Sequence, residues 1–154
     1  MATNVSSDLI WQITRTQNAY LVKRNSGGGS QFSRDPLNLQ NKHSFKYAGY
    51  ANTKAVGVQA TENGGVAVLS KKPGNPQQPG KNLVTVTYGP STGTRKIYKG
   101  VADKTAKNGY RADLREDAVA RVSAIRRSQK VKKATPARKP RGAQARKAAE
   151  KDSE

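Results

Sequence analysis

The chain contains no cysteine, so disulfide bridges, thiol chemistry and cysteine-based zinc sites are excluded. It also lacks long apolar runs. Leu9–Trp11 and Val66–Leu69 are among the longest, far short of the roughly 20 apolar residues that span a bilayer. No charged-then-apolar leader precedes a cleavage-like site, so we expect a protein of the cytosol or nucleus without a membrane partner.

Groups that serve in catalysis are scarce as well. His43 is the only histidine, and no pair of carboxylates has a suggestive spacing. The run Gly27–Ser30 lacks the lysine that completes a phosphate-binding loop. The sequence therefore predicts no enzyme, no metal site, no cofactor and no small-molecule substrate. We expect His43 to be a surface or RNA-contacting residue rather than a base or a ligand.

Acidic residues are few, with 10 Asp and Glu against 29 Lys and Arg, which gives a net charge of +19. Like charges at this density oppose compaction unless a polyanion neutralises them. Nucleic acid is the expected polyanion, because phosphates bound by Lys and Arg release condensed counterions. Hydrophobic residues make up only 34% of the chain, so we expect a small core whose stability depends partly on the partner.

Composition divides the chain into three zones. Residues 1 to about 90 are strand-like and rich in turns, and residues 93 to 128 are helix-like and basic. Residues 129–154 form a basic low-complexity tail that has too few apolar side chains to fold alone. We predict an α+β RNA-binding domain over residues 1–128, followed by a tail that is disordered or ordered by RNA. The domain is itself basic, since its 20 basic and 7 acidic residues leave +13.

The first zone opens on a helix signal. Leu9, Ile10 and Ile13 have helical spacing after the capping residues Ser6–Asp8, which predicts a short helix that ends near Thr16. Three features are predicted after this helix: a strand over 20–22 that closes on Lys23 and Arg24, a glycine loop at 27–29, and a turn at 35–38.

Alternating residues indicate a small antiparallel sheet. His43–Tyr47 alternates between polar and apolar side chains and is a strand candidate. A hairpin is predicted over Val56–Leu69, where Asn63 and Gly64 supply positive φ at both central positions of the turn. The proline-rich segment 71–80 is predicted to be an exposed loop, and Leu83–Tyr88 a further strand.

The second zone changes to a helical period. Thr94 is predicted to cap a helix that carries Ile97, Val101 and Ala102 on one face, with a left-handed end at 108–109. A second helix is predicted from about residue 113 to residue 128. One face of this helix carries Leu114, Ala118, Val122 and Ile125. The predicted fold is thus a small antiparallel sheet with a short N-terminal helix, two C-terminal helices and the basic tail.

The second helix also carries Arg115, Arg121, Arg126 and Arg127 off its apolar stripe, so we expect the face opposite the core to be rich in guanidinium groups. Arginine presents a planar fork of donors that fits phosphate and stacks on bases. The alternative is a solvated face whose arginines pair with nearby acidic residues. The +13 on the body favours contact with RNA.

Two further features have competing interpretations. The tail cations at 130–133 and 138–141 are typical of an extension that threads between RNA helices, but also of a nuclear-import signal or a solubilising end. Aromatic residues near basic ones can stack on unpaired bases, yet alternating aromatics are more often part of a core. These aromatic residues are Phe45, Tyr47, Tyr50 and Tyr98.

Six segments in a fixed order carry a family resemblance: Leu21–Asn25, Asp35–Leu39, His43–Gly49, Lys54–Val58, Tyr110–Arg115 and Ser123–Lys130. Over about residues 5–132 the chain resembles the eukaryotic large-subunit ribosomal protein family L-twenty-eight-e. The resemblance implies an α+β domain bound to large-subunit ribosomal RNA beside neighbouring ribosomal proteins, without catalysis. It also implies cytosolic ribosomes, with transit through the nucleus and nucleolus for assembly. The segments 27–29 and 73–80 look like lineage variation.

We therefore expect a structural constituent of the large ribosomal subunit that stabilises ribosomal RNA through basic side chains. The residues predicted to contact RNA are Lys23, Arg24, Lys46, Arg111, Arg115, Arg126, Arg127 and Lys130. The main alternative is a nucleolar ribosome-assembly factor, since one such family has a related domain, although its members carry cysteines and a long acidic extension. A general nucleic-acid-binding module and an RNA-modifying enzyme are the remaining alternatives.

Overall fold

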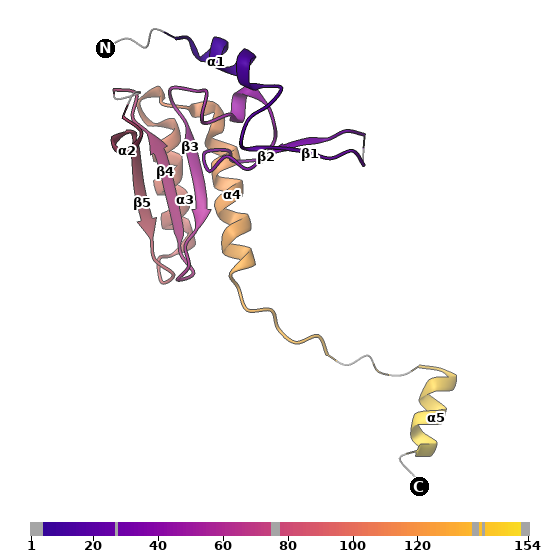
Figure 1. Cartoon of the computed structure of the whole chain (residues 1–154). Coiled ribbons are helices and arrows are strands. Elements are labelled where there is room, and N and C mark those ends of the chain that lie inside the picture. Colours follow the sequence, from indigo (N-terminus) through magenta and orange to yellow (C-terminus); the bar gives the residue numbers. More distant parts are fainter. Residues whose placement is uncertain (1–4, 27, 75–77, 137–138, 140, 152–154) are drawn as a thin grey trace.

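The computed structural model describes residues 5–26, 28–74, 78–136, 139 and 141–151. A three-stranded antiparallel sheet of order β3-β4-β5 is covered on one face by two helices, α3 and α4 (Figure 1). A two-stranded hairpin, β1-β2, and the short helix α1 lie at one end of this body (Figure 1). The predicted α+β class is confirmed. Within the described residues, no helix has the length and apolar character needed to cross a membrane.

The N-terminal helix α1 (Ser7–Thr14) begins as predicted, because the Ser6 hydroxyl accepts a hydrogen bond from the Leu9 N–H at 3.2 Å. Strand β1 (Leu21–Lys23) is also confirmed, and it pairs with β2 (Gln31–Ser33), which the sequence analysis did not predict. Gly27, in the loop between them, lies outside the described residues. Gly28 has a φ of +75°, a left-handed conformation that favours glycine.

The predicted strand over His43–Tyr47 is wrong, because Phe45–Tyr47 forms a single turn of 3-10 helix, η1. The Ser44 carbonyl accepts hydrogen bonds from the N–H groups of Tyr47 and Ala48, at 3.2 and 3.0 Å. In this turn Phe45 packs on the Trp11 ring, with centroids 5.8 Å apart, while Tyr47 packs against the core. The alternating pattern of residues 43–47 therefore reflects a tight turn, in which the two aromatic rings pack against different partners.

The sheet contains β3 (Val56–Ala60), β4 (Val66–Lys71) and β5 (Leu83–Tyr88), with β4 in the centre. The predicted hairpin is confirmed, but its turn differs in detail. Gly64 has a φ of +80°, whereas Asn63 keeps a negative φ. The connection spans residues 61–65 and is closed by hydrogen bonds from Thr61 to Gly65 and from Gly64 to Thr61, both at 3.1 Å. This longer loop does not need the two left-handed residues of a two-residue turn.

The segment 71–80 is only partly the loop that was predicted. Residues 72–74 are exposed and irregular, but Lys71 belongs to β4, and a single helical turn, α2 (Pro79–Asn82), begins before the segment ends. Proline is excluded from helix interiors but tolerated at the first helical position, where Pro79 lies. Residues 75–77 lie outside the described residues.

The two long helices are confirmed. Helix α3 (Thr94–Ala106) begins with Thr94 as its first helical residue, since Gly93 occupies the capping position assigned to Thr94. The helix continues into a 3-10 turn, η2 (Lys107–Gly109), in which Asn108 has the predicted left-handed φ, at 58°. Another 3-10 turn, η3 (Ala112–Leu114), leads into α4 (Arg115–Ser128).

The core lies between the sheet and the two helices. Its buried residues are Leu39, Val56, Val58, Val66, Val68, Ile97, Val101, Leu114, Ala118 and Val122. The predicted stripe on α4 is confirmed, with Ile125 half-buried at its end. Six of these ten side chains are valines, so the core is small, as the composition predicted.

The described part of the tail contains a helix, α5 (Ala143–Lys151), that the sequence analysis did not predict. Alanine, arginine and lysine have high helix propensity, which accounts for local helix formation without a core. Helix α5 lies apart from the body (Figure 1) and therefore adds nothing to the core. Residues 137–138, 140 and 152–154 of the tail lie outside the described residues.

The segment 36–37 packs tightly against the sheet at Gly57, in β3. A Cβ atom placed on Gly57 would overlap the Pro36 carbonyl oxygen and lie 3.0 Å from the Leu37 Cα. Both neighbours are backbone atoms, which cannot rotate away as a flexible side chain does. Gly57 therefore allows the N-terminal half of the body to sit on the sheet.

Gly57→Ala is expected to lower the free energy of unfolding by about 1–3 kcal/mol, the usual cost of forcing atoms into a packed interior. Gly74→Ala is the control, because a Cβ there meets no atom within 4 Å. Urea unfolding of both variants measures the difference. Equal stability of the two variants would contradict the close packing at Gly57.

Candidate nucleic-acid interface

Few cations in the described part of the chain have an acidic partner. Within the described residues only two ion pairs form, Lys46–Asp117 at 3.9 Å and Arg111–Asp113 at 2.9 Å. The chain as a whole carries 29 basic side chains against 10 acidic ones. The surface of the body therefore has a large excess of positive charge, which favours a polyanionic partner.

The β1-β2 hairpin carries Lys23 and Arg24, and both side chains are exposed. Phe32 lies on the neighbouring strand, paired with Val22, and is 45% exposed. Because Phe32 pairs with Val22, alternation along the strand puts Arg24 on the same face of the hairpin as Phe32 and Lys23 on the other face. The ring can stack on a base while the cations bind phosphate. Phe32 is not among the residues predicted from the sequence, where its signal is a short alternating context, Gln31-Phe32-Ser33.

Helix α4 differs from the prediction of an arginine-rich outer face. Arg115 and Arg127 are exposed, but Arg121 and Arg126 are half-buried. Helical spacing explains this, because Arg121 follows the buried Ala118 by three residues and Arg126 follows the buried Val122 by four. From residue 117 to residue 126, the exposed positions are Ala120, Ser123 and Ala124.

Arg126 uses its guanidinium group within the protein. Its Nη1 donates to the Gly64 carbonyl at 3.2 Å and its Nη2 to the Pro90 carbonyl at 3.1 Å. These bonds tie the β3-β4 loop and the segment that follows β5 to α4. The buried Nε of Arg121, by contrast, has no hydrogen-bond partner in the described part of the chain.

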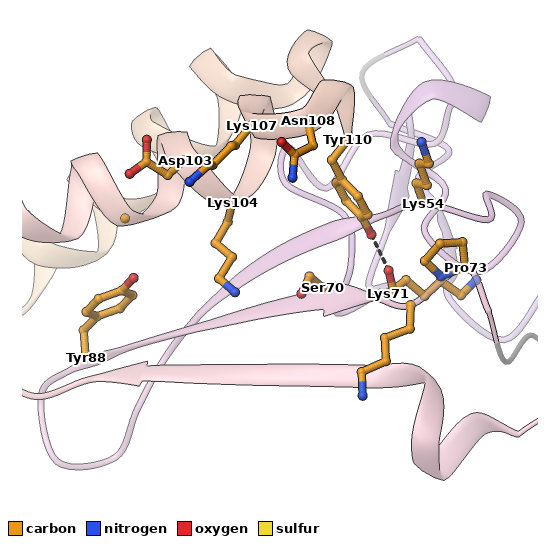
Figure 2. Close-up of a pocket in the computed structure, with 12 residues that line it drawn as sticks. Lys54, Ser70, Lys71, Pro73, Tyr88, Asp103, Lys104, Lys107, Asn108 and Tyr110 are labelled. Carbon is orange, nitrogen blue, oxygen red and sulfur yellow. Dashed lines mark hydrogen bonds between the residues drawn. The ribbon is translucent and has the colours of Figure 1, made fainter.

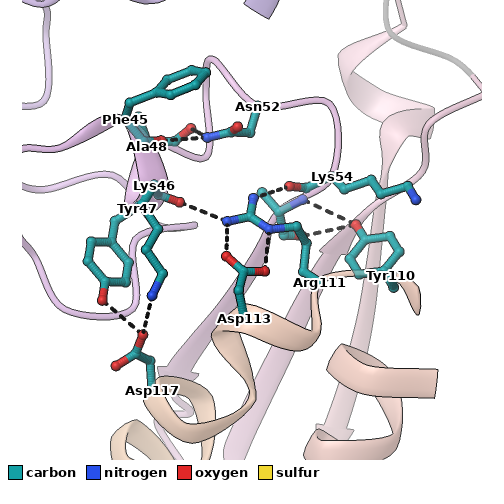
Figure 3. A network of polar contacts seen from close by, with 11 residues as sticks. Phe45, Lys46, Tyr47, Ala48, Asn52, Lys54, Tyr110, Arg111, Asp113 and Asp117 are labelled. Atoms are coloured by element: carbon teal, nitrogen blue, oxygen red, sulfur yellow. Dashed lines mark hydrogen bonds and ion pairs between the residues drawn. The ribbon is translucent and has the colours of Figure 1, made fainter. Parts of the chain in front are cut away.

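Arg111 joins three segments in the most extensive polar network of the body (Figure 3). Its Nε and Nη2 both donate to the Asp113 carboxylate at 2.9 Å. Nη1 donates to the Lys54 carbonyl at 2.9 Å, and Nη2 also donates to the Lys46 carbonyl at 3.0 Å. The side chain is only 16% exposed. Arg111 therefore fixes the 46–54 segment to the start of α4.

Lys46 lies beside this network and is exposed, with its ammonium 3.9 Å from Asp117 and 5.2 Å from the Tyr47 ring centroid. The Tyr47 hydroxyl donates to Asp117 at 2.9 Å. Partial burial, together with this hydrogen bond, raises the pKa of Tyr47 above its usual value. Lys46 and Arg111 are thus the two predicted contact residues that the fold brings together.

The remaining predicted residues fall into separate groups. Lys23 and Arg24 are on the hairpin, Arg115 begins α4, and Arg126 and Arg127 end it. At about 1.5 Å per residue, Arg115 and Arg127 are roughly 18 Å apart along the helix. The exposed Lys130 follows the last turn of α4, where Gln129 holds the chain to the sheet by donating to the Gly65 carbonyl at 2.8 Å. The candidate interface is therefore broad rather than a single cleft.

The four aromatic residues considered for stacking are all half-buried. Tyr47 and Tyr98 pack against the core, and Phe45 packs on Trp11. Tyr50 stacks near Tyr20, with centroids 5.9 Å apart, and its hydroxyl accepts hydrogen bonds from Thr14 and Asn18 at 3.3 Å. Packing is thus the main role of these rings.

His43 has a packing role. Its Nε2 lies 2.7 Å from the Arg15 carbonyl, and its ring lies 5.0 Å from that of Trp11. Within the described residues, no cluster of three or more histidine, cysteine or acidic side chains is arranged to hold a metal ion. His43 instead connects α1 to the segment that precedes η1.

The body has a small valine-rich core, and many cations without acidic partners are spread over its surface. This architecture is typical of a basic protein that binds a polyanion. Residues 9–128 match the model of the Ribosomal L28e protein family. The chain therefore belongs to this family, which consists of ribosomal proteins and not of enzymes. The resemblance carried by the six sequence segments is confirmed.

Three relatives, each named large ribosomal subunit protein eL28, are similar over most of their length. The relative from Schizosaccharomyces pombe is 45% identical over 131 residues, which cover 84% of this chain and 97% of the relative. That from Dictyostelium discoideum is 35% identical over 135 residues, covering 88% and 97%. That from Caenorhabditis elegans is 33% identical over 130 residues, covering 84% and 94%.

The bond between Arg111 and Asp113 predicts an acid-dependent contribution to stability. Hydrogen bonds from Arg111 hold the pKa of Asp113 below its ordinary value of 3.8. The folded state then binds the proton less readily than the unfolded chain, so this stabilisation is complete above the ordinary pKa. It is lost as the pH falls through the lowered one.

Asp113→Asn is expected to reduce the free energy of unfolding at neutral pH, with a deficit relative to the wild type that vanishes in strong acid. Urea titrations at a series of pH values measure this deficit. Glu62→Gln is the control, because it removes an exposed carboxylate that forms no ion pair within the described residues. A deficit that stays constant down to the lowest pH would argue against the ion pair as its cause.

Proposed function

We propose that this protein is a structural constituent of the large ribosomal subunit that binds and stabilises ribosomal RNA through basic side chains. The observation that carries the proposal is the uncompensated charge. The chain belongs to a ribosomal protein family and has a net charge of +19. Within the described residues, only two ion pairs offset any of its positive charge. Ribosomal RNA is the polyanion that such a surface would meet in a ribosomal subunit.

The proposed mechanism is electrostatic. RNA backbones that converge in a compact particle repel one another, and cations placed between them neutralise the phosphates. The rigid body holds these cations in fixed positions, so less conformational entropy is lost on binding than with a flexible chain. The exposed predicted residues are the candidates for direct contact: Lys23, Arg24, Lys46, Arg115, Arg127 and Lys130.

Arg111 and Arg126 have a different part in this proposal. Each binds backbone carbonyls inside the protein, as described above. We infer that they act on RNA by positioning Lys46 and the sheet loops, and that they contact phosphate only through donors that stay accessible. Phe32 is added as a stacking residue on the hairpin that carries Lys23 and Arg24.

Partners and location follow from the proposed assembly. The relatives are named as proteins of the large ribosomal subunit, which supports ribosomal RNA and neighbouring ribosomal proteins as the partners of this chain. We propose that it works in cytosolic ribosomes after transit through the nucleus and nucleolus. Residues 1–128 would form the RNA-binding body and residues 129–154 a separate basic extension, a division supported by the family match, which ends at residue 128.

Sedimentation of the tagged full chain tests the proposal. A structural constituent is expected to migrate with mature large subunits and with translating ribosomes, and to stay bound at high salt. Migration with nuclear precursor particles alone would instead favour an assembly factor. Release from subunits by moderate salt would indicate a loose nucleic-acid binder.

Lys23→Gln combined with Arg24→Gln is expected to lower the salt dependence of binding to deproteinised large-subunit RNA. Each phosphate that is no longer neutralised reduces the slope of log affinity against log salt by about 0.7–0.9, so the pair should reduce it by roughly 1.4–1.8. The control pair Arg95→Gln and Lys99→Gln removes the same charge from exposed positions on α3. An equal effect of both pairs would contradict a specific role for the hairpin.

A further inference from the structure

A cavity of about 740 Å³ lies between the C-terminal end of α3 and the strands β4 and β5 (Figure 2). Ser70 on β4 and Tyr88 on β5 line it from the sheet, on the same face as the valine core. Helix α3 lines it from above. None of the exposed residues predicted to contact RNA from the sequence takes part in this cavity.

Tight packing shapes the cavity. A Cβ atom on Gly100 would overlap the Tyr88 hydroxyl, so the Tyr88 ring lies directly against the backbone of α3. At the other end, the Tyr110 hydroxyl donates to the Lys71 carbonyl and accepts from the Ala55 N–H, the latter at 3.2 Å. These contacts join α3, its 3-10 extension and the sheet, so the cavity is preformed.

Four lysines besides Lys71 line the cavity: Lys72, Lys104 and Lys107, which are exposed, and Lys54, which is half-buried with its ammonium 5.8 Å from the centroid of the Tyr110 ring. Lys104 extends from α3 toward the sheet (Figure 2). The only acidic side chain in the lining is Asp103, and none of the four lysines forms an ion pair within the described residues. Like charges gathered round one cavity repel one another, and a bound anion would relieve that repulsion.

Lys71 also lines the cavity, but its ammonium is committed to contacts within the protein. Its ammonium donates to the carbonyls of Gly49, Tyr50 and Asn52, at 2.9, 3.3 and 2.9 Å. Burial lowers its pKa, because desolvation disfavours the charged form. Lys71 therefore anchors the 49–52 segment, and the other four lysines are available to a ligand.

We propose that this cavity binds the phosphate of an unpaired ribosomal RNA nucleotide, an inference that rests on the RNA binding proposed above. Lysine is a compact point charge that binds phosphate oxygens without a fixed fork geometry, which suits four flexible stems round one group. The volume is that of a small-ligand pocket and accommodates a nucleotide. The side chains of Ser70 and Asn108, which also line the cavity, would bind the ribose or the base.

The same lysines would attract an acidic peptide, so the choice of RNA needs support. Besides its lysines and Asp103, the cavity is lined by a serine, an asparagine and two tyrosines. Their hydroxyl and amide groups can bind the ribose and base edges of a nucleotide, and aromatic rings can stack on a base. A glutamate-rich segment would bind the lysines but would have no use for the aromatic rings and the other polar groups of the lining. Together with membership of a ribosomal protein family, the polar lining favours RNA.

The test compares two double variants of the full chain. Lys104→Gln with Lys107→Gln removes two cavity cations, and Arg95→Gln with Lys99→Gln removes two exposed cations from the same helix outside the cavity. The probe is a fluorescent single-stranded uridine RNA of about ten nucleotides, and anisotropy gives its Kd over a range of salt concentrations. Thermal unfolding of both variants checks that each one folds.

For the cavity variant, the salt slope is expected to fall by about 1.4, or about 0.7 for each phosphate of a single strand that the protein no longer neutralises. Its Kd near physiological salt should rise roughly tenfold, while the control pair should change the slope by less than half as much. Equal changes in the two pairs would overturn the cavity site and leave general RNA binding intact. If the wild-type protein binds neither this probe nor deproteinised large-subunit RNA, the proposed function itself fails.

Chemical protection of the unmodified protein gives a second measurement that does not depend on folding of variants. An amine-reactive ester should acylate Lys104 and Lys107 in the free protein, and the uridine RNA should protect them relative to the internal reference Lys99. A polyglutamate peptide of matched charge serves as competitor. Protection by this peptide that equals or exceeds that by RNA would overturn the proposal in favour of an acidic protein partner.

Discussion

The packing of α3 and α4 against the valine face of the sheet fixes the positions of the basic side chains that these helices and the sheet carry. Six valines, with few larger side chains, form most of that contact, so the apolar contribution is modest for a chain of this length. Beyond the edge of the core, polar contacts continue the attachment of the helices to the rest of the body. Tyr110 and Arg111, between the two helices, bind backbone carbonyls of the 46–55 segment and of β4.

Three of the ten acidic residues organise the fold. The buried Asp35 accepts hydrogen bonds from the N–H groups of Leu37 and Tyr50, at 2.9 and 3.1 Å, and so shapes the segment that packs on Gly57. Asp117 binds the hydroxyl of Tyr47, and Asp113 binds Arg111. Because these carboxylates are committed to internal contacts, little negative charge is left to balance the surface cations.

The proposed RNA contacts differ in kind over the surface. The hairpin carries two exposed cations and an exposed phenylalanine, which combines charge with stacking. On α4, the exposed Arg115 and Arg127 lie at opposite ends, and the exposed positions 120, 123 and 124 between them carry small side chains. In the cavity under α3, several lysines converge on one volume. A broad interface of this type secures an RNA fold at many points and needs no single high-affinity site.

The sequence alone determined the elements whose signals are local. The Ser6 cap, the strand pattern of residues 83–88 and the apolar stripe of α4 each depend on residues a few positions apart, and all three are present. The net charge, and hence the class of partner, also follows from composition. Tertiary structure alone decided three other outcomes. Residues 43–47 form a turn, the Arg111 guanidinium donates to backbone carbonyls far away in the sequence, and lysines from three segments line one cavity. Those outcomes depend on contacts between residues some 50 positions apart, and no local period in the chain encodes which distant groups will meet.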